Sequence, residues 1–86
     1  MDYKKNPFLW YVDVKDESLA ELLADRVKTL DGYNINVHIY ENTDGNFDLI
    51  ISSKISSKQR GRENITKEQL FKYLNLLADA FKMANE

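Results

Sequence analysis

Two stretches of the chain repeat apolar residues at helical spacing. In the first, residues 16–32, leucine and valine recur every three or four positions until Gly32. This spacing places the apolar side chains on one face of a helix of about four turns. Either Asp16 or Ser18 can cap its start. Ser18 and Glu21 have the spacing of a capping box. The pattern predicts an amphipathic helix.

The second helical stretch covers residues 67–85 and follows Thr66, which has capping-box spacing to Gln69. Its polar residues form one narrow stripe, so apolar residues cover roughly 240° of the helix circumference. A surface helix needs an apolar stripe of only ~100° or somewhat more. The helix is therefore expected either to wedge between a sheet and the first helix, or to offer a partner its surplus apolar residues, Tyr73, Leu76, Ala80 and Met83.

Alternation of apolar and polar residues predicts three strands. Residues 7–14 begin with a proline and continue with mostly aromatic and β-branched residues. Their expected buried face carries Phe8, Trp10, Val12 and Val14. Residues 33–55 also alternate, and the sequence Asp44-Gly45 divides them into a hairpin, because glycine tolerates the positive φ of a tight turn.

The expected order of elements is βαββα in one domain, residues 1–86. A right-handed crossover and burial of the most apolar strand favour strand order 1-3-2, with both helices on one face of a two-layer α+β sandwich. This arrangement resembles a ferredoxin-like domain that lacks its last strand. The first strand is then expected to be an apolar edge that another chain can pair with.

Composition narrows the class of protein. The chain has 86 residues, 43% of them hydrophobic, and no cysteine, which predicts a small globular domain without disulfides. The longest apolar runs are far shorter than the ~20 residues that span a bilayer. No secretory signal is recognisable at the N-terminus, so a cytoplasmic protein without a membrane partner is expected.

Charge is distributed unevenly along the chain. Residues 1–51 carry ten acids and five bases, whereas residues 52–62 carry four bases and no acid. The net charge is −2, unlike the strongly basic character of a general nucleic-acid binder. The alternative function is a nucleic-acid-associated protein that contacts phosphates through the basic loop 54–62, because this segment precedes a helix N-terminus. The candidate anion-binding residues are Lys54, Lys58, Arg60, Arg62 and Lys67.

Two classes of RNA-binding domain also carry basic residues near a sheet, but neither matches this sequence. An RRM carries stacking aromatics on its central strand, and Asp48, Ile50 and Ser52 occupy the corresponding outward positions here. A double-stranded-RNA-binding domain also has lysines before its last helix, but it has three strands after its first helix, and two are expected here. The segment is therefore expected to be a loop that contacts phosphates or an acidic protein, or is merely solvated.

Candidate catalytic chemistry is sparse. His38 is the only histidine, and without cysteine a metal site would need carboxylates for its other ligands. Asp48 across the hairpin could assist it as an acid or base, but no nucleophile accompanies the pair. The alternating Asn and Asp residues at 42–48 place Gly45 wrongly for an EF-hand loop. Neither enzymatic activity, a cofactor, a metal nor a small-molecule substrate is expected.

The favoured function is a non-enzymatic interaction domain that self-associates or binds a protein partner. Inhibitors and accessory proteins of bacteria and phages include many chains of this kind. Aromatic anchors with a polar rim are typical of protein interfaces. The expected interface residues are Leu9, Tyr11, His38, Tyr40, Ile50, Tyr73, Leu76 and Met83.

Overall fold

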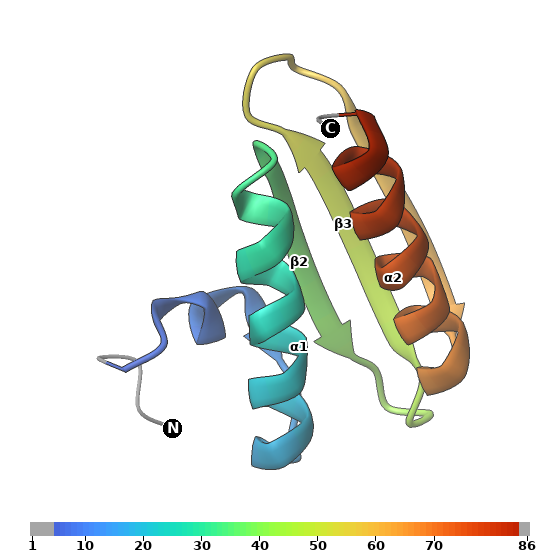
Figure 1. The fold of residues 1–86 in the computed structure, drawn as a ribbon. Helices are drawn as coiled ribbons and strands as arrows, with labels where there is room; N and C mark the ends of the chain where they lie inside the picture. Colours follow the sequence, from blue (N-terminus) through green and yellow to red (C-terminus); the bar gives the residue numbers. More distant parts are fainter. Residues whose placement is uncertain (1–4, 85–86) are drawn as a thin grey trace.

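The computed structural model describes residues 5–84 (Figure 1). A short 3-10 helix leads into four strands and two helices that form an α+β fold. Their order and bounds are η1 (Pro7–Tyr11), β1 (Val12–Asp13), α1 (Glu17–Asp31), β2 (Ile35–Glu41), β3 (Phe47–Ser53), β4 (Gln59–Ile65) and α2 (Lys67–Ala84).

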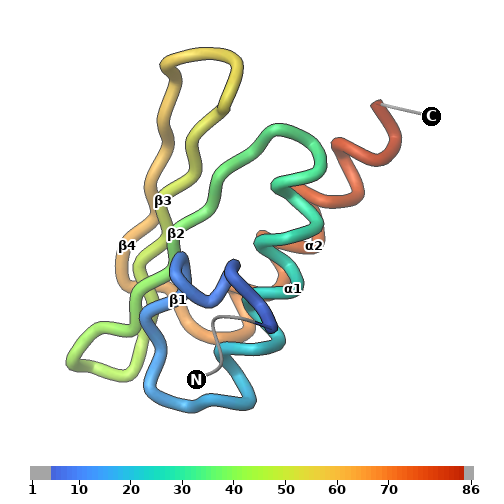
Figure 2. Tube along the Cα trace, turned by 90° about the vertical axis from the view of Figure 1, so that its left-hand side faces the viewer, coloured from blue at the N-terminus to red at the C-terminus, as the bar shows by residue number. Residues whose placement is uncertain are grey.

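The strands form one mixed sheet in the order β1-β2-β3-β4. β1 is parallel to β2, and β2, β3 and β4 are antiparallel neighbours. Both helices cover the same face of the sheet, and the described elements leave the other face uncovered (Figure 2). The expected two-layer α+β class with two helices on one face is confirmed, whereas the expected three strands and their order 1-3-2 are wrong.

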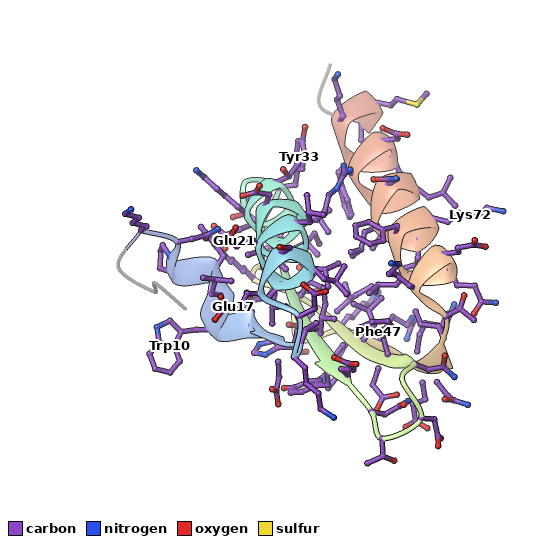
Figure 3. All side chains as sticks on the ribbon, turned by 90° about the horizontal axis from the view of Figure 1, so that it is seen from below. Trp10, Glu17, Glu21, Tyr33, Phe47 and Lys72 are labelled. Carbon is purple, nitrogen blue, oxygen red and sulfur yellow. The ribbon has the colours of Figure 1, made fainter. Side chains whose placement is uncertain are left out.

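The N-terminal segment departs most from expectation. The side chain of Asn6 accepts a hydrogen bond from the Phe8 amide at 3.2 Å, and Pro7 supplies a φ suited to a first helical turn. This segment therefore begins as η1 rather than as a strand, and β1 has only two residues. Trp10, expected in the core, is 73% exposed and projects away from the body of the protein (Figure 3).

The basic segment is also not the expected loop. Gln59–Ile65 pairs with β3 as the edge strand β4, leaving only a short connection at the tip of the β3–β4 hairpin. Its residues are exposed apart from the half-buried Ile65, so the segment lacks the apolar alternation that identifies a strand in sequence.

Both long helices begin at capping residues. The Asp16 carboxylate accepts from the Leu19 amide at 3.1 Å and caps α1, whereas Ser18 lies inside the helix. Thr66 and Gln69 make both expected capping-box bonds at α2, at 3.2 and 2.9 Å.

The hydrophobic core lies between the helices and the covered face of the sheet. α1 contributes most of its apolar face, but α2 buries fully only Leu70 and Leu74, both in its first half. The second half of α2 has weaker support, including stacking of Phe81 on Tyr33 at 6.2 Å between ring centroids. The largest fully buried side chains are Leu23, Val27, Leu30, Val37, Ile39, Leu49, Leu70 and Leu74.

A network of amide side chains joins the β2–β3 turn to β4. The side-chain oxygen of Asn64 accepts from the side-chain amides of Asn42 and Asn46, at 3.2 and 3.0 Å. The Asn64 backbone amide donates to the Asp48 carboxylate at 2.9 Å. These bonds lie beside the bulge that interrupts β3–β4 pairing between Phe47 and Leu49. The alternating Asn and Asp residues thus build a turn, as expected in place of a calcium loop.

Candidate protein-interaction surfaces

The uncovered face of the sheet is the first candidate surface, called here the open sheet face. Directly paired residues of neighbouring strands share a face, so the registers define its members. His38 pairs with Ile50, and Ile50 pairs with Gly61, which gives one row across β2, β3 and β4. Neighbouring rows place Tyr40 beside Asp13 and Asp48 at one end, and Asn36 and Ser52 beside Gln59 at the other.

Three aromatic rings lie along one side of this face. Tyr11 meets His38 edge-on, with centroids 4.8 Å apart and an interplanar angle of 80°. His38 lies nearly parallel to Tyr40 at 6.4 Å, with an interplanar angle of 14°. T-shaped and parallel arrangements at these distances are favourable aromatic contacts. The rings therefore support one another in fixed orientations and form a continuous patch.

Gly61 sets the shape of the open sheet face beside Ile50. A Cβ at this position would make only ordinary contact, 3.6 Å from the backbone oxygen of Leu49. The glycine is therefore not required by crowding in the monomer. Its lack of a side chain leaves the half-buried Ile50 accessible from the β4 side of the sheet.

Most of the expected members of this surface lie on it, with one correction. Tyr11, His38, Tyr40 and Ile50 share the open sheet face, but Leu9 is only 3% exposed and belongs to the core. The change follows from η1, whose turn directs Leu9 inward and Trp10 outward. The first strand is an edge of the sheet, as expected, but β1 has only two residues, so the long apolar edge expected over residues 7–14 is wrong.

The contribution of β4 to the open sheet face was not expected from the sequence. Gln59 and Gly61 lie on it, whereas Arg60 and Arg62 lie on the helix side, opposite Ile51 and Leu49. The period-two alternation of arginine with smaller residues was the available signal. It is weak, because a solvated loop can have the same pattern.

A second candidate surface lies on the helix side, along the edge of the sheet. The guanidinium of Arg62 sits over the ring of Tyr73, with its central carbon 5.5 Å from the ring centroid. Tyr73, Leu76, Ala80 and Met83 recur at spacings of three and four, so they form one stripe on the outer flank of α2, with Tyr73 at the side next to β4. Leu76 is 59% exposed and Met83 73%, whereas Tyr73 is half-buried. We call this stripe, with Arg60 and Arg62, the α2–β4 surface.

The five candidate anion-binding residues do not form one cluster. Lys54 forms a salt bridge with Asp31 at the end of α1. Lys58 lies at the hairpin tip, whereas Lys67 begins α2 beyond the opposite end of β4 (Figure 1). Only Arg60 and Arg62 lie side by side on one face of a strand. The structure therefore disperses the charge that the sequence concentrates.

The presence of β4 also removes one ground for setting aside a double-stranded-RNA-binding domain. Three strands follow α1, where two were expected. The charges near the start of α2 do not suit a polyanion, however, because Lys67 is followed by Glu68 and the neighbouring β2–β3 turn carries Asp44. Phosphate binding relies on accumulated positive charge, so this end of the fold offers little electrostatic attraction.

Catalytic and metal-binding arrangements gain no support from the geometry. His38 contacts two tyrosine rings, and no group of three or more His, Asp or Glu within residues 5–84 could hold a metal ion. A hollow of about 570 Å³ at the end of α1 is wide open and lined by Asp25, Lys28, Thr29, Gly32 and Tyr33. In the part of the chain that the structure describes, no helix is long and apolar enough to cross a membrane.

Comparisons with protein-family models, with curated proteins and with solved structures found no match for this chain. The two surfaces are therefore interpreted from their geometry.

Proposed function

We propose that the chain is a non-enzymatic protein-interaction domain that self-associates through the open sheet face. The observation that carries this proposal is the continuous patch of Tyr11, His38 and Tyr40 beside Ile50, on a face that no described element covers. Aromatic and aliphatic anchors surrounded by polar groups are typical of the centre of a protein interface.

The charges of this face favour one arrangement of two copies. Asp13 and Asp48 lie at the end near the β2–β3 turn, and the other end carries the uncharged side chains of Asn36, Ser52 and Gln59. A two-fold axis through the middle row, with strands of the two copies antiparallel, brings each acidic end over an uncharged end. Like charges are then kept apart, and Tyr40 of each copy meets amide and hydroxyl groups.

This arrangement is compatible with the packing of two sheets. Face-to-face sheets lie ~10 Å apart with strands within about 30° of one another, and their inward side chains interdigitate. Gly61 leaves room beside Ile50 for a side chain of the other copy. The same residues would contact each other in both directions, as a two-fold interface requires.

The test is sedimentation velocity of the wild-type chain and two matched variants over a wide concentration range. Ile50→Asp places a carboxylate at the centre of the open sheet face and should shift the dimer to monomer. Ile55→Asp makes the same chemical change at the hairpin tip, where the side chain is 83% exposed, and should leave the dimer intact. Circular dichroism establishes that both variants are folded.

Two results would contradict the proposal. One is a wild-type chain that stays monomeric at every concentration. The other is a dimer that Ile50→Asp does not weaken relative to Ile55→Asp, which would place the contact elsewhere.

A further inference from the structure

The outer edge of β4 is the strongest feature that self-association through the open sheet face does not use. β4 is the last strand of the sheet, and within residues 5–84 it pairs only with β3. Alternate residues of an edge strand direct their amides and carbonyls away from the sheet, where another strand can bind them. A bulge follows Arg62, so the regular part of this edge is Gln59–Arg62.

The side chains beside this edge combine positive charge with apolar surface. Arg60 and Arg62 lie on the helix side, and Lys58 precedes them at the hairpin tip. Tyr73 of the α2 stripe sits over Arg62, and the exposed Leu76 follows it along the flank of α2. Arg62 is already held against Tyr73, which orients its guanidinium beside the edge.

A second copy of the chain is a poor occupant for this edge. Suppose that two β4 strands pair antiparallel and the helices stay on one side, so that the α2 stripes also meet. If Gly61 of one copy pairs with Gly61 of the other, Arg60 lies opposite Arg62 of the other copy. If the pairing is centred on either arginine instead, that arginine lies opposite the same arginine of the other copy. Like charges directly opposite one another destabilise a strand pair. The positive charges therefore protect the edge from pairing with itself.

The same charges favour an acidic occupant. We infer that β4 binds an extended, acidic segment of a partner protein as a fifth strand of the sheet. Its backbone would pair with Gln59–Arg62, its carboxylates would meet Arg60 and Arg62, and an apolar side chain on the same face would contact Tyr73. Strand addition gains affinity from main-chain hydrogen bonds and specificity from alternate side chains.

A nucleic acid fits this surface less well. It would neutralise the arginines, but it has no strand-like backbone to satisfy the edge of β4. The acidic remainder of the chain, with five more acids than bases over residues 1–51, would also repel a polyanion.

The test measures binding of three fluorescein-labelled, nine-residue peptides by fluorescence anisotropy. One alternates glutamate with valine, the second has lysine for each glutamate, and the third is the acidic peptide with proline at two valine positions. The acidic peptide should bind and the lysine peptide should not. The proline peptide should bind much more weakly, because proline cannot donate a strand hydrogen bond.

Protein variants locate the site. The double variant Arg60→Gln/Arg62→Gln should bind the acidic peptide roughly tenfold more weakly, because two charge pairs are lost at a partly exposed site. Arg26→Gln is the matched control, since this exposed side chain lies on α1, away from β4, and it should leave affinity unchanged. The same titration at a protein concentration where sedimentation shows the wild-type chain to be monomeric should give the same affinity, which separates this site from self-association through the open sheet face.

Three outcomes would overturn the inference. Absence of acidic-peptide binding removes it, and equal binding of the acidic and proline peptides shows that the edge is not paired. A labelled single- or double-stranded RNA that binds more tightly than the acidic peptide, and loses affinity in Arg60→Gln/Arg62→Gln, assigns the arginines to nucleic acid instead.

Discussion

Asn64 links three properties of the chain at one position. Its φ of 55° lies in the left-handed region, which asparagine tolerates better than most residues other than glycine. Its side-chain oxygen receives two amide hydrogen bonds from the β2–β3 turn. Asn64 therefore holds the turn against β4 at the point where the bulge ends regular pairing.

Substitutions at Asn64 should separate backbone strain from hydrogen bonding. Asn64→Ala loses both the permitted φ and the network, so we expect the free energy of unfolding to fall by about 1–2 kcal/mol. Asn64→Gly loses the network but tolerates the positive φ, so its loss should be smaller. Urea denaturation followed by circular dichroism measures both. Equal losses would show that the conformation at this position is unimportant.

Single residues also explain where sequence patterns fail. Trp10 alternates with Val12 and Val14, which suggested one buried face, but only the two valines are buried. Asn6 and Pro7 favour a helical turn locally, and this turn changes the phase of the alternation before β1 begins. The alternation is visible in the sequence, but it does not show that the Asn6 side chain accepts a hydrogen bond from the Phe8 amide.

Among the elements, α1 offers a clear test of capping. Asp16 accepts the Leu19 amide and lies at the positive end of the helix dipole, whereas Ser18 is exposed within the first turn. We expect Asp16→Ala to lower the free energy of unfolding by about 1 kcal/mol. Ser18→Ala should change it by no more than about 0.5 kcal/mol in either direction. Thermal and urea denaturation provide the values.

The opposite ranking would be informative. If Ser18→Ala destabilised the protein more than Asp16→Ala, the helix would begin at Ser18 with the capping box that its spacing to Glu21 allows.

Predictability differed between elements for a physical reason. α1, α2, β2 and β3 bury one face, and burial imposes a period on their sequences. β4 is an edge strand whose six leading residues are exposed, so no burial pattern marks it. β3 was expected to be central because it is apolar, and it does have a neighbour on each side. The second neighbour is β4 rather than the first strand.

The same difference between elements with a buried face and elements without one decides which parts of the candidate surfaces could be predicted. The open-face positions of β2 and β3 could be deduced from alternation within the hairpin, so Tyr40 and Ile50 were placed correctly. Leu9 could not, because its side depends on η1. The α2–β4 surface needed the pairing of β4 with β3, which puts Arg62 beside Tyr73. That pairing is a tertiary property without a local sequence signal.

At the scale of the whole molecule, stability should be distributed unevenly. β3 is paired on both sides, whereas β4 is paired on one, and the fully buried residues of α2 lie in its first half. We expect amide hydrogens of β3 to exchange more slowly than those of β4, and the last two turns of α2 to exchange faster than its first two. Hydrogen exchange of the wild-type protein, followed by NMR, measures this order.

Conditions for that measurement matter, because the proposed self-association would add protection. Ile50→Asp, which is expected to be monomeric, provides the reference. Uniform protection of all strands in this variant would contradict the expected order.

The strand order β2-β3-β4 repeats the order of these strands along the chain. Each pairs with the next through a short connection, so little loop-closure entropy opposes these contacts. Pairing of β1 with β2 instead closes a loop that contains all of α1. Paired residues are therefore close together in the sequence for most of the sheet, and they are far apart where β1 pairs with β2. Contacts between residues far apart in the sequence slow folding. The chain meets its main topological barrier to folding where its N-terminal segment joins the β2–β4 meander.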